Sequence, residues 1–199
     1  MPRRYLLSVV LGAMLVFVWG GFAWAGGLYN RFLHPLPGGE ATLRAFASVP
    51  ASGMYVYPSE APLDSTASPE AREAAAKARL EQGAKGPIVM AAISKEGFPQ
   101  DDPRMLVRGF LIELFATSML VAVLGLAGSG HGRLRRFLAL QAMVAFMALS
   151  THMIFWAFMN APNDWTAVLV FDSWVGWTLA GLPAVFLMRA MREGDASAA

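Results

Sequence analysis

Four long stretches that carry almost no charge constrain the fold of this chain more than any other feature. They cover residues 5–25, 106–127, 137–159 and 165–188, and each is 21 to 24 residues long. A helix rises about 1.5 Å per residue, so a helix of this length crosses the roughly 30 Å hydrocarbon core of a bilayer. Only 15% of all residues are charged, whereas about a quarter are charged in soluble domains. We therefore expect four membrane-spanning helices.

The basic residues that flank these stretches predict how the chain is oriented. Arginines lie before the first stretch, between the second and the third, and after the fourth, but the turn 160–164 has no Lys or Arg. Short basic segments stay in the cytoplasm. Both termini, with a tail at 189–199, and the loop 128–136 are therefore predicted to be cytoplasmic. Residues 26–105 are predicted to face outward, because long segments cross the membrane largely regardless of their charge.

Residues 1–25 also have the features of a secretory signal peptide. Two arginines precede an apolar run that ends in a small-x-small sequence at residues 23–25. However, the run is longer than the 7 to 15 residues usual for a signal peptide. Trp19 and Trp24 also suit a helix that ends in the aromatic belt of a membrane. We expect the first helix to be retained.

The composition excludes several classes of function. The chain has no cysteine, so disulfides, thiolate metal sites and thiol redox chemistry are excluded. The net charge of +2 needs no nucleic-acid partner, because membrane orientation explains the arginines. No P-loop, nucleophile elbow or HExxH motif is present. We expect no catalytic residue, no cofactor and no metal, and a membrane enzyme with a pocket under the outer segment remains only as a third interpretation.

The outer segment, residues 26–105, has the character of a small soluble unit. Its pattern predicts a helix, a strand, a helix that ends at Gly83, and a second strand, at 40–49, 52–58, 69–82 and 86–94. Two strands do not make a stable sheet alone, so this unit should lean on the membrane helices or on a partner. The predicted fold is an all-α transmembrane four-helix bundle with a small α/β extracytoplasmic cap inserted between helices 1 and 2.

Ionisable residues inside three of the stretches mark one depth in the membrane. Glu113, His152 and Asp172 each lie seven residues from the outer end of their stretch, which is about 10 Å along a helix. Arg108 lies roughly one turn nearer the outside. Such side chains are costly in lipid and usually turn towards the interior of a bundle. We therefore predict that they meet.

The residues at helical spacing from this polar cluster indicate which helix faces meet. Small and polar residues share a face with each ionisable residue, and such residues let helices approach and bond. The first helix is expected to pack outside the cluster. The supporting residues are Thr117 on the second helix and Gln141 and Trp156 on the third; small residues at the same spacing are Gly176 and Ala180 on the fourth helix and, on the first helix outside the cluster, Gly12, Val16 and Gly20.

Three interpretations of the cluster remain open. In a structural one, Arg108 pairs with Glu113 or Asp172 and His152 bridges the acids, which would fix the helix register. In a second, the cluster relays protons or ions, or lines a small-ligand pocket. A metal site is a weak third interpretation, because one histidine and two acids form a poor ligand set without a supporting motif.

Five short segments carry a resemblance to known proteins. The sequences VFVWGGFAW, SGMYVYP, GPIVMAAIS, MLVRGFLIELFA and FDSWVGWTLAGL resemble a group of uncharacterised small bacterial four-helix inner-membrane proteins with an outward-facing cap. The resemblance covers most of the chain. It implies a location in the bacterial inner (cytoplasmic) membrane with residues 26–105 in the periplasm. It implies no activity, cofactor or catalytic residue.

Two functions follow as hypotheses from these features. The first is a non-enzymatic membrane protein, an accessory or assembly subunit that binds a larger membrane complex through its cap and lipid-facing helices. The second is a small transporter or a proton- or ion-conducting unit that uses the polar cluster, as an oligomer, because four helices leave little room for a pore. The expected partners are the lipid bilayer and a membrane protein or further copies of this chain.

Overall fold

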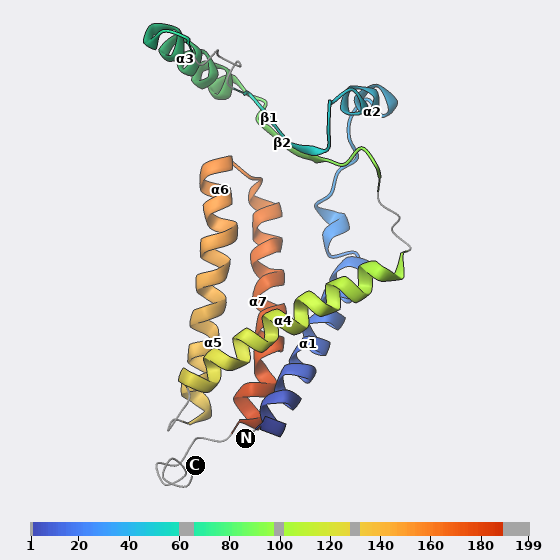
Figure 1. Cartoon of the computed structure of the whole chain (residues 1–199), viewed down its shortest axis with the longest axis vertical. Coiled ribbons are helices and arrows are strands. Elements are labelled where there is room, and N and C mark those ends of the chain that lie inside the picture. Colours follow the sequence, from blue (N-terminus) through green and yellow to red (C-terminus); the bar gives the residue numbers. More distant parts are fainter. Residues whose placement is uncertain (1, 60–65, 98–101, 128–131, 189–199) are drawn as a thin grey trace. The chain divides into compact units, whose positions relative to one another are not determined.

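The structure, a computed structural model, describes residues 2–59, 66–97, 102–127 and 132–188. The chain divides into two compact units (Figure 1). We call residues 1–34 with 101–199 the helical unit and residues 35–100 the small unit. The tail predicted at 189–199 lies outside the described residues.

Four helical segments of the helical unit are long and apolar enough to cross a membrane, as expected. Each begins earlier than its uncharged stretch, because the helix continues into the polar flank. Proline at the first helical position also explains two of the early starts, since its fixed backbone suits that place. The segments are α1 (Pro2–Ala25), α4 (Pro103–Ala127), the continuous run of α5 (Arg133–Ala148), η2 (Leu149–Met153) and α6 (Ile154–Met159), and α7 (Asn163–Leu187).

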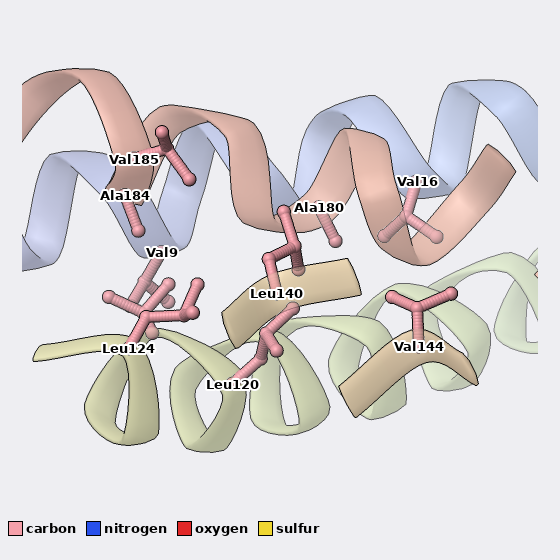
Figure 2. Packing of buried hydrophobic residues seen from close by; sticks show 10 residues of the cluster. Val9, Val16, Leu120, Leu124, Leu140, Val144, Ala180, Ala184 and Val185 are labelled. Atoms are coloured by element: carbon pink, nitrogen blue, oxygen red, sulfur yellow. The ribbon is translucent and has the colours of Figure 1, made fainter. Parts of the chain in front are cut away.

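The helices of this unit share a hydrophobic core, and a smaller buried cluster of Ala23, Tyr29 and Val168 lies apart from it. α7 contacts α1, α5 and α4, and α4 also packs on α1. Figure 2 shows side chains from all four segments meeting in the core. Many outward-facing residues are large and apolar, for example Ile112 at 68% and Phe146 at 73% exposure, as a helix in lipid requires. The buried core residues are Val9, Val16, Leu120, Val121, Leu124, Leu140, Val144, Ala180, Ala184 and Val185.

α1 and α7 approach each other very closely at Gly12. A Cβ atom on Gly12 would overlap the carbonyl oxygen of Ala180, so only glycine permits this approach. A Cβ on Gly176 would lie 3.4 Å from a methyl group of Val16. The expectation that the first helix packs outside the cluster is therefore wrong, because its Gly12 and Val16 face α7 directly. Gly20, which was expected on the same contact, lies in open space, since a Cβ atom there would meet nothing within 4 Å.

The small unit contains the predicted order of helix, strand, helix and strand. Its elements are α2 (Glu40–Ala47), β1 (Gly53–Tyr57), α3 (Pro69–Lys85) and β2 (Val89–Ile93). The strands pair antiparallel, with Tyr55 opposite Ala91. Ser68 caps α3 by accepting a hydrogen bond of 3.2 Å from the amide of Ala71. The helix does not end at Gly83 as predicted, because Gly86 with φ +67° supplies the left-handed residue that ends it.

Hydrogen bonds around Ser52 close one end of the two-stranded sheet. Its hydroxyl donates to Oε2 of Glu96 at 2.6 Å and accepts from the amide of Lys95 at 3.0 Å. The bond from Ser52 holds the pKa of Glu96 below its ordinary value near 4.5. A depressed carboxyl pKa stabilises the fold above its unfolded value, and this contribution is lost as the pH falls through the folded pKa.

We expect Ser52→Ala to raise the pKa of Glu96 towards the ordinary value, because the bond that favours its charged form is removed. NMR titration of the Glu96 carboxyl carbon in the full chain in detergent measures this change. Ser94→Ala is the control, since it removes a neighbouring hydroxyl that makes no bond to Glu96 among the described residues. An unchanged Glu96 titration in Ser52→Ala would contradict this assignment.

Candidate functional site

Asp172 on α7 is the centre of the polar contacts inside the helical unit. Its Oδ1 atom accepts a hydrogen bond of 2.8 Å from Nε1 of Trp19 on α1. Gly176, one turn later on α7, makes room for this indole, since a Cβ there would lie 3.2 Å from Cδ1 of Trp19. Tyr29 in η1 (Tyr29–Arg31) is 4% exposed, and its phenol also interacts with the Asp172 carboxylate. Asp172 is thus held by the indole of Trp19, and the Tyr29 phenol lies near enough to interact with it.

Glu113 and Thr117 bring further polar atoms to this region from α4. Glu113 is partly buried, and it interacts electrostatically with Asp172. Its Oε2 atom is buried without a hydrogen-bond partner among the described residues. Thr117 follows one helical turn later, is fully buried, and its Oγ1 likewise has no partner in the described part of the chain. Thr117 faces α1, because its Cγ2 atom lies 2.8 Å from the Cβ position of Gly12.

His152 reaches α7 from a π-helical turn. It lies in η2, a segment of wider helix that interrupts the run from α5 to α6. Its Nε2 atom is 2.8 Å from Oγ of Ser173, the residue after Asp172. His152 and Asp172 are close enough to interact electrostatically, although the described hydrogen bond is to the serine. The sequence suggested that His152 bridges the two acids by hydrogen bonds. In the structure it bonds instead to Ser173, the residue next to Asp172.

Two other residues expected to support the cluster bond to α7 at different levels. Nε2 of Gln141 donates to Oγ1 of Thr178 at 3.1 Å. Nε1 of Trp156 donates to Oδ1 of Asn163 at 2.7 Å, at the start of α7 and away from Asp172. Together with the His152 contact, these bonds join the third spanning segment to α7 along its length. They fix the register between the two segments.

Arg108 does not join the acids. Its side chain is exposed on α4, and among the described residues it makes no ion pair with Glu113 or Asp172. Helix geometry explains the difference, because residues five apart point about 140° away from each other. The indole of Trp19 is the donor to Asp172 instead. The pairing that the sequence suggested for Arg108 is thus not seen in the described structure.

Sequence reasoning missed three residues of this site. Trp19 was assigned to the aromatic belt, although it lies seven residues after Gly12 and so shares its helix face. The only sequence feature that pointed to Ser173 was its position next to Asp172. Tyr29 lies beyond the end of α1, where no helical periodicity points to its burial.

The small residues that share a face with Asp172 on the fourth helix contact the first helix, which was not expected. Gly176 and the carbonyl of Ala180, one and two turns after Asp172, approach α1 closely. The hydrogen bonds of α7 to the third segment come from Ser173 and Thr178. The polar side chains therefore lie on two adjacent faces of α7, one towards α1 and one towards α5 and η2.

This arrangement can bind or exchange a proton more readily than it can hold a metal. It offers one carboxylate with an indole donor, a second carboxyl oxygen without a partner, and a histidine–serine pair. No group of three or more His, Cys, Asp or Glu side chains within the described ranges is placed to hold a metal ion.

Comparisons with protein-family models, with curated protein sequences and with solved structures find nothing that matches this chain. The resemblance to small bacterial four-helix inner-membrane proteins therefore rests on the five short segments alone. A function for the chain must accordingly be inferred from its own geometry.

Proposed function

We propose that the chain is a non-catalytic membrane protein that acts as an accessory or assembly subunit of a larger membrane complex. In this proposal the small unit lies outside the bacterial inner membrane, as the flanking arginines predict, and binds a partner polypeptide there. The observation that supports it most directly is the sheet of β1 and β2, which is apolar on both faces and largely uncovered.

The register of the two strands shows what each face presents. Directly opposed residues of an antiparallel pair point to the same side. Met54, Val56 and Met90 lie on one face, and they are 63%, 52% and 36% exposed. Tyr57 and Val89 lie on the other face, at 50% and 43%. Strands that are apolar on both sides are typical of sheets covered on both sides.

Within 35–59 and 66–97, the described ranges of the small unit, no residue is buried in a core that could stabilise this sheet. Neither α2 nor α3 contains a buried residue. An isolated pair of strands is marginally stable at best in water. Covering the exposed half of each of these side chains contributes about 1 kcal/mol per side chain, roughly half the value for complete burial. A partner that covers the sheet therefore supplies the stability that the unit lacks.

A polypeptide fits this surface better than the membrane surface does. Both outer edges of a two-stranded sheet carry backbone N–H and C=O groups without strand partners. Lipid tails cover apolar side chains but cannot bond these groups. A partner strand satisfies both needs, because it extends the sheet by backbone hydrogen bonds and covers alternate side chains. We therefore assign the surface to a protein partner.

Native mass spectrometry of the full chain, purified in mild detergent from its own membranes, tests this proposal. We expect a complex of fixed stoichiometry that contains a second membrane polypeptide beside the 21.5 kDa chain. Val56→Lys should remove the partner, because it places a charge in the covered face. Leu80→Lys is the matched control, since Leu80 is 73% exposed on the polar helix α3.

Two outcomes would contradict the proposal. One is a protein that runs as a single copy or as a self-oligomer, with no second polypeptide in fixed ratio. The other is a complex that Val56→Lys and Leu80→Lys weaken equally, because the sheet would then have no special part in binding. Circular dichroism of the full-length variants must also show that both keep the helical content of the wild-type protein.

A second candidate function is favoured by one specific observation. Glu113 Oε2 and Thr117 Oγ1 are buried without a described partner, beside an electrostatically linked Asp172. Such groups in a spanning segment are usual in proton and ion pathways. If the chain conducts protons, reconstituted vesicles should show flux that Glu113→Gln abolishes without loss of folded protein. Vesicles with wild-type protein that show no flux above empty vesicles would eliminate this candidate.

A further inference from the structure

Arginines from two helices meet at the carboxyl end of a third. Nη1 of Arg4 on α1 donates to the carbonyl of Leu187 at 3.5 Å, and Nη1 of Arg136 on α5 donates to the carbonyl of Met188. Arg136 is only 3% exposed. Because these two carbonyls are consecutive, both guanidinium groups lie at one place, where the ends of α1, α5 and α7 converge.

More arginines surround this place. Arg3, next to Arg4, and Arg133 and Arg135, next to Arg136, are exposed. No Asp or Glu occurs among the described residues of this end, at 2–8, 120–127, 132–136 and 181–188. α5 begins with three arginines at the positive end of its dipole, and its N-cap Gly132 offers no side chain to cap it. The described part of this end therefore contains five arginines and no Asp or Glu.

Apolar side chains border the arginines on the outer surface of the same helix turns. Leu6 and Leu7 follow Arg3 and Arg4 on α1, at 63% and 47% exposure. Leu134 and Leu138 lie beside the arginines of α5, at 71% and 57%. A surface that offers cations at the end of a spanning helix and apolar side chains directly beside them matches both parts of a lipid molecule.

We propose that this end of the helical unit binds the headgroup of an anionic phospholipid. Arg3, Arg133 and Arg135 contact the phosphate, while Arg4 and Arg136 hold the end of α7 in place. A guanidinium suits this role because its planar fork bonds two phosphate oxygens at once. The acyl chains lie along the exposed leucines of α1 and α5. This lipid site shares no residue with the sheet surface or with the polar contacts around Asp172.

Native mass spectrometry of the full chain in detergent, with phosphatidylglycerol or phosphatidylcholine added, tests the site. Wild-type protein should keep phosphatidylglycerol and lose phosphatidylcholine at equal concentration. The double variant Arg133→Gln, Arg135→Gln should bind phosphatidylglycerol about 25-fold more weakly, about fivefold for each arginine. Arg104→Gln, Arg108→Gln is the matched control, because it removes equal charge from exposed arginines at the opposite end of a spanning helix.

Each outcome decides the proposal. Retention of the anionic lipid in the control variant and its loss in the test variant support it. Equal retention of both lipids by the wild-type protein overturns it, and this comparison needs no variant to fold. Equal loss in both variants overturns it as well, since binding would then follow net charge alone. Displacement of the lipid by millimolar inorganic phosphate would overturn it too, because the site would then take a free anion instead.

Discussion

Gly12→Val should lower the free energy of unfolding by about 3 kcal/mol, the largest effect that we expect for a single small substitution. A Cβ at this position overlaps the carbonyl oxygen of Ala180, and it lies 2.8 Å from Cγ2 of Thr117. Backbone on the α7 side cannot move aside as a flexible side chain can, so the helices must separate. Such overpacking costs about 1–3 kcal/mol, and more where nothing gives way.

Unfolding of the full chain in detergent, followed by circular dichroism, measures this loss. Gly20→Val is the matched control, since it makes the same change eight residues later on the same helix, where nothing lies within 4 Å. The control should change stability by less than about 0.5 kcal/mol, as surface substitutions usually do. If the two variants were equally stable, the proposed packing of Gly12 against the backbone of α7 would be contradicted.

Trp19→Phe should be the second most disruptive change. It removes the indole N–H that donates to Asp172 at 2.8 Å and leaves the carboxylate without that bond. Hydrogen bonds to charged groups contribute about 1.5–3 kcal/mol, and bonds between membrane helices measure somewhat less. We therefore expect a loss of about 1–3 kcal/mol. Asp172→Asn should cost less, because the amide oxygen can still accept from the indole.

Trp174→Phe is the control for the loss of an indole ring. Trp174 lies on α7 at 41% exposure, and no hydrogen bond of its indole is described. Chemical unfolding followed by tryptophan fluorescence compares the three variants with the wild-type protein. A Trp19→Phe variant as stable as Trp174→Phe would show that the bond between α1 and α7 contributes nothing measurable.

The sequence predicted the spanning helices well because the membrane acts on composition directly. A stretch of more than twenty residues without charge is long enough to cross a bilayer and is unusual in soluble domains. The small unit was also predicted in its correct order, because local signals such as the Ser68 cap and the following proline mark a helix start. The ends of elements were less accurate, since Gly83 and Gly86 both resemble helix stops and only the backbone conformation distinguishes them.

The neighbours of each helix could not be predicted in the same way. Depth along a helix follows from counting residues, and this count placed Glu113, His152 and Asp172 at one level. Which helices meet depends on rotation about each axis and on the order of helices around the bundle. These properties come from packing, such as the fit of Gly12 on Ala180, which brings α1 and not α4 closest to α7.

The π-helical turn at Leu149–Met153 has a consequence for how this chain would compare with related ones. One residue more than a regular helix needs rotates everything beyond it by about 100°. Without that residue, Ile154–Met159 would face another direction, and Trp156 would turn away from Asn163. A related chain could therefore lack one residue at 149–153. Such a gap would mean that the helical turns at 154–159 point in another direction, and it would not be an alignment error.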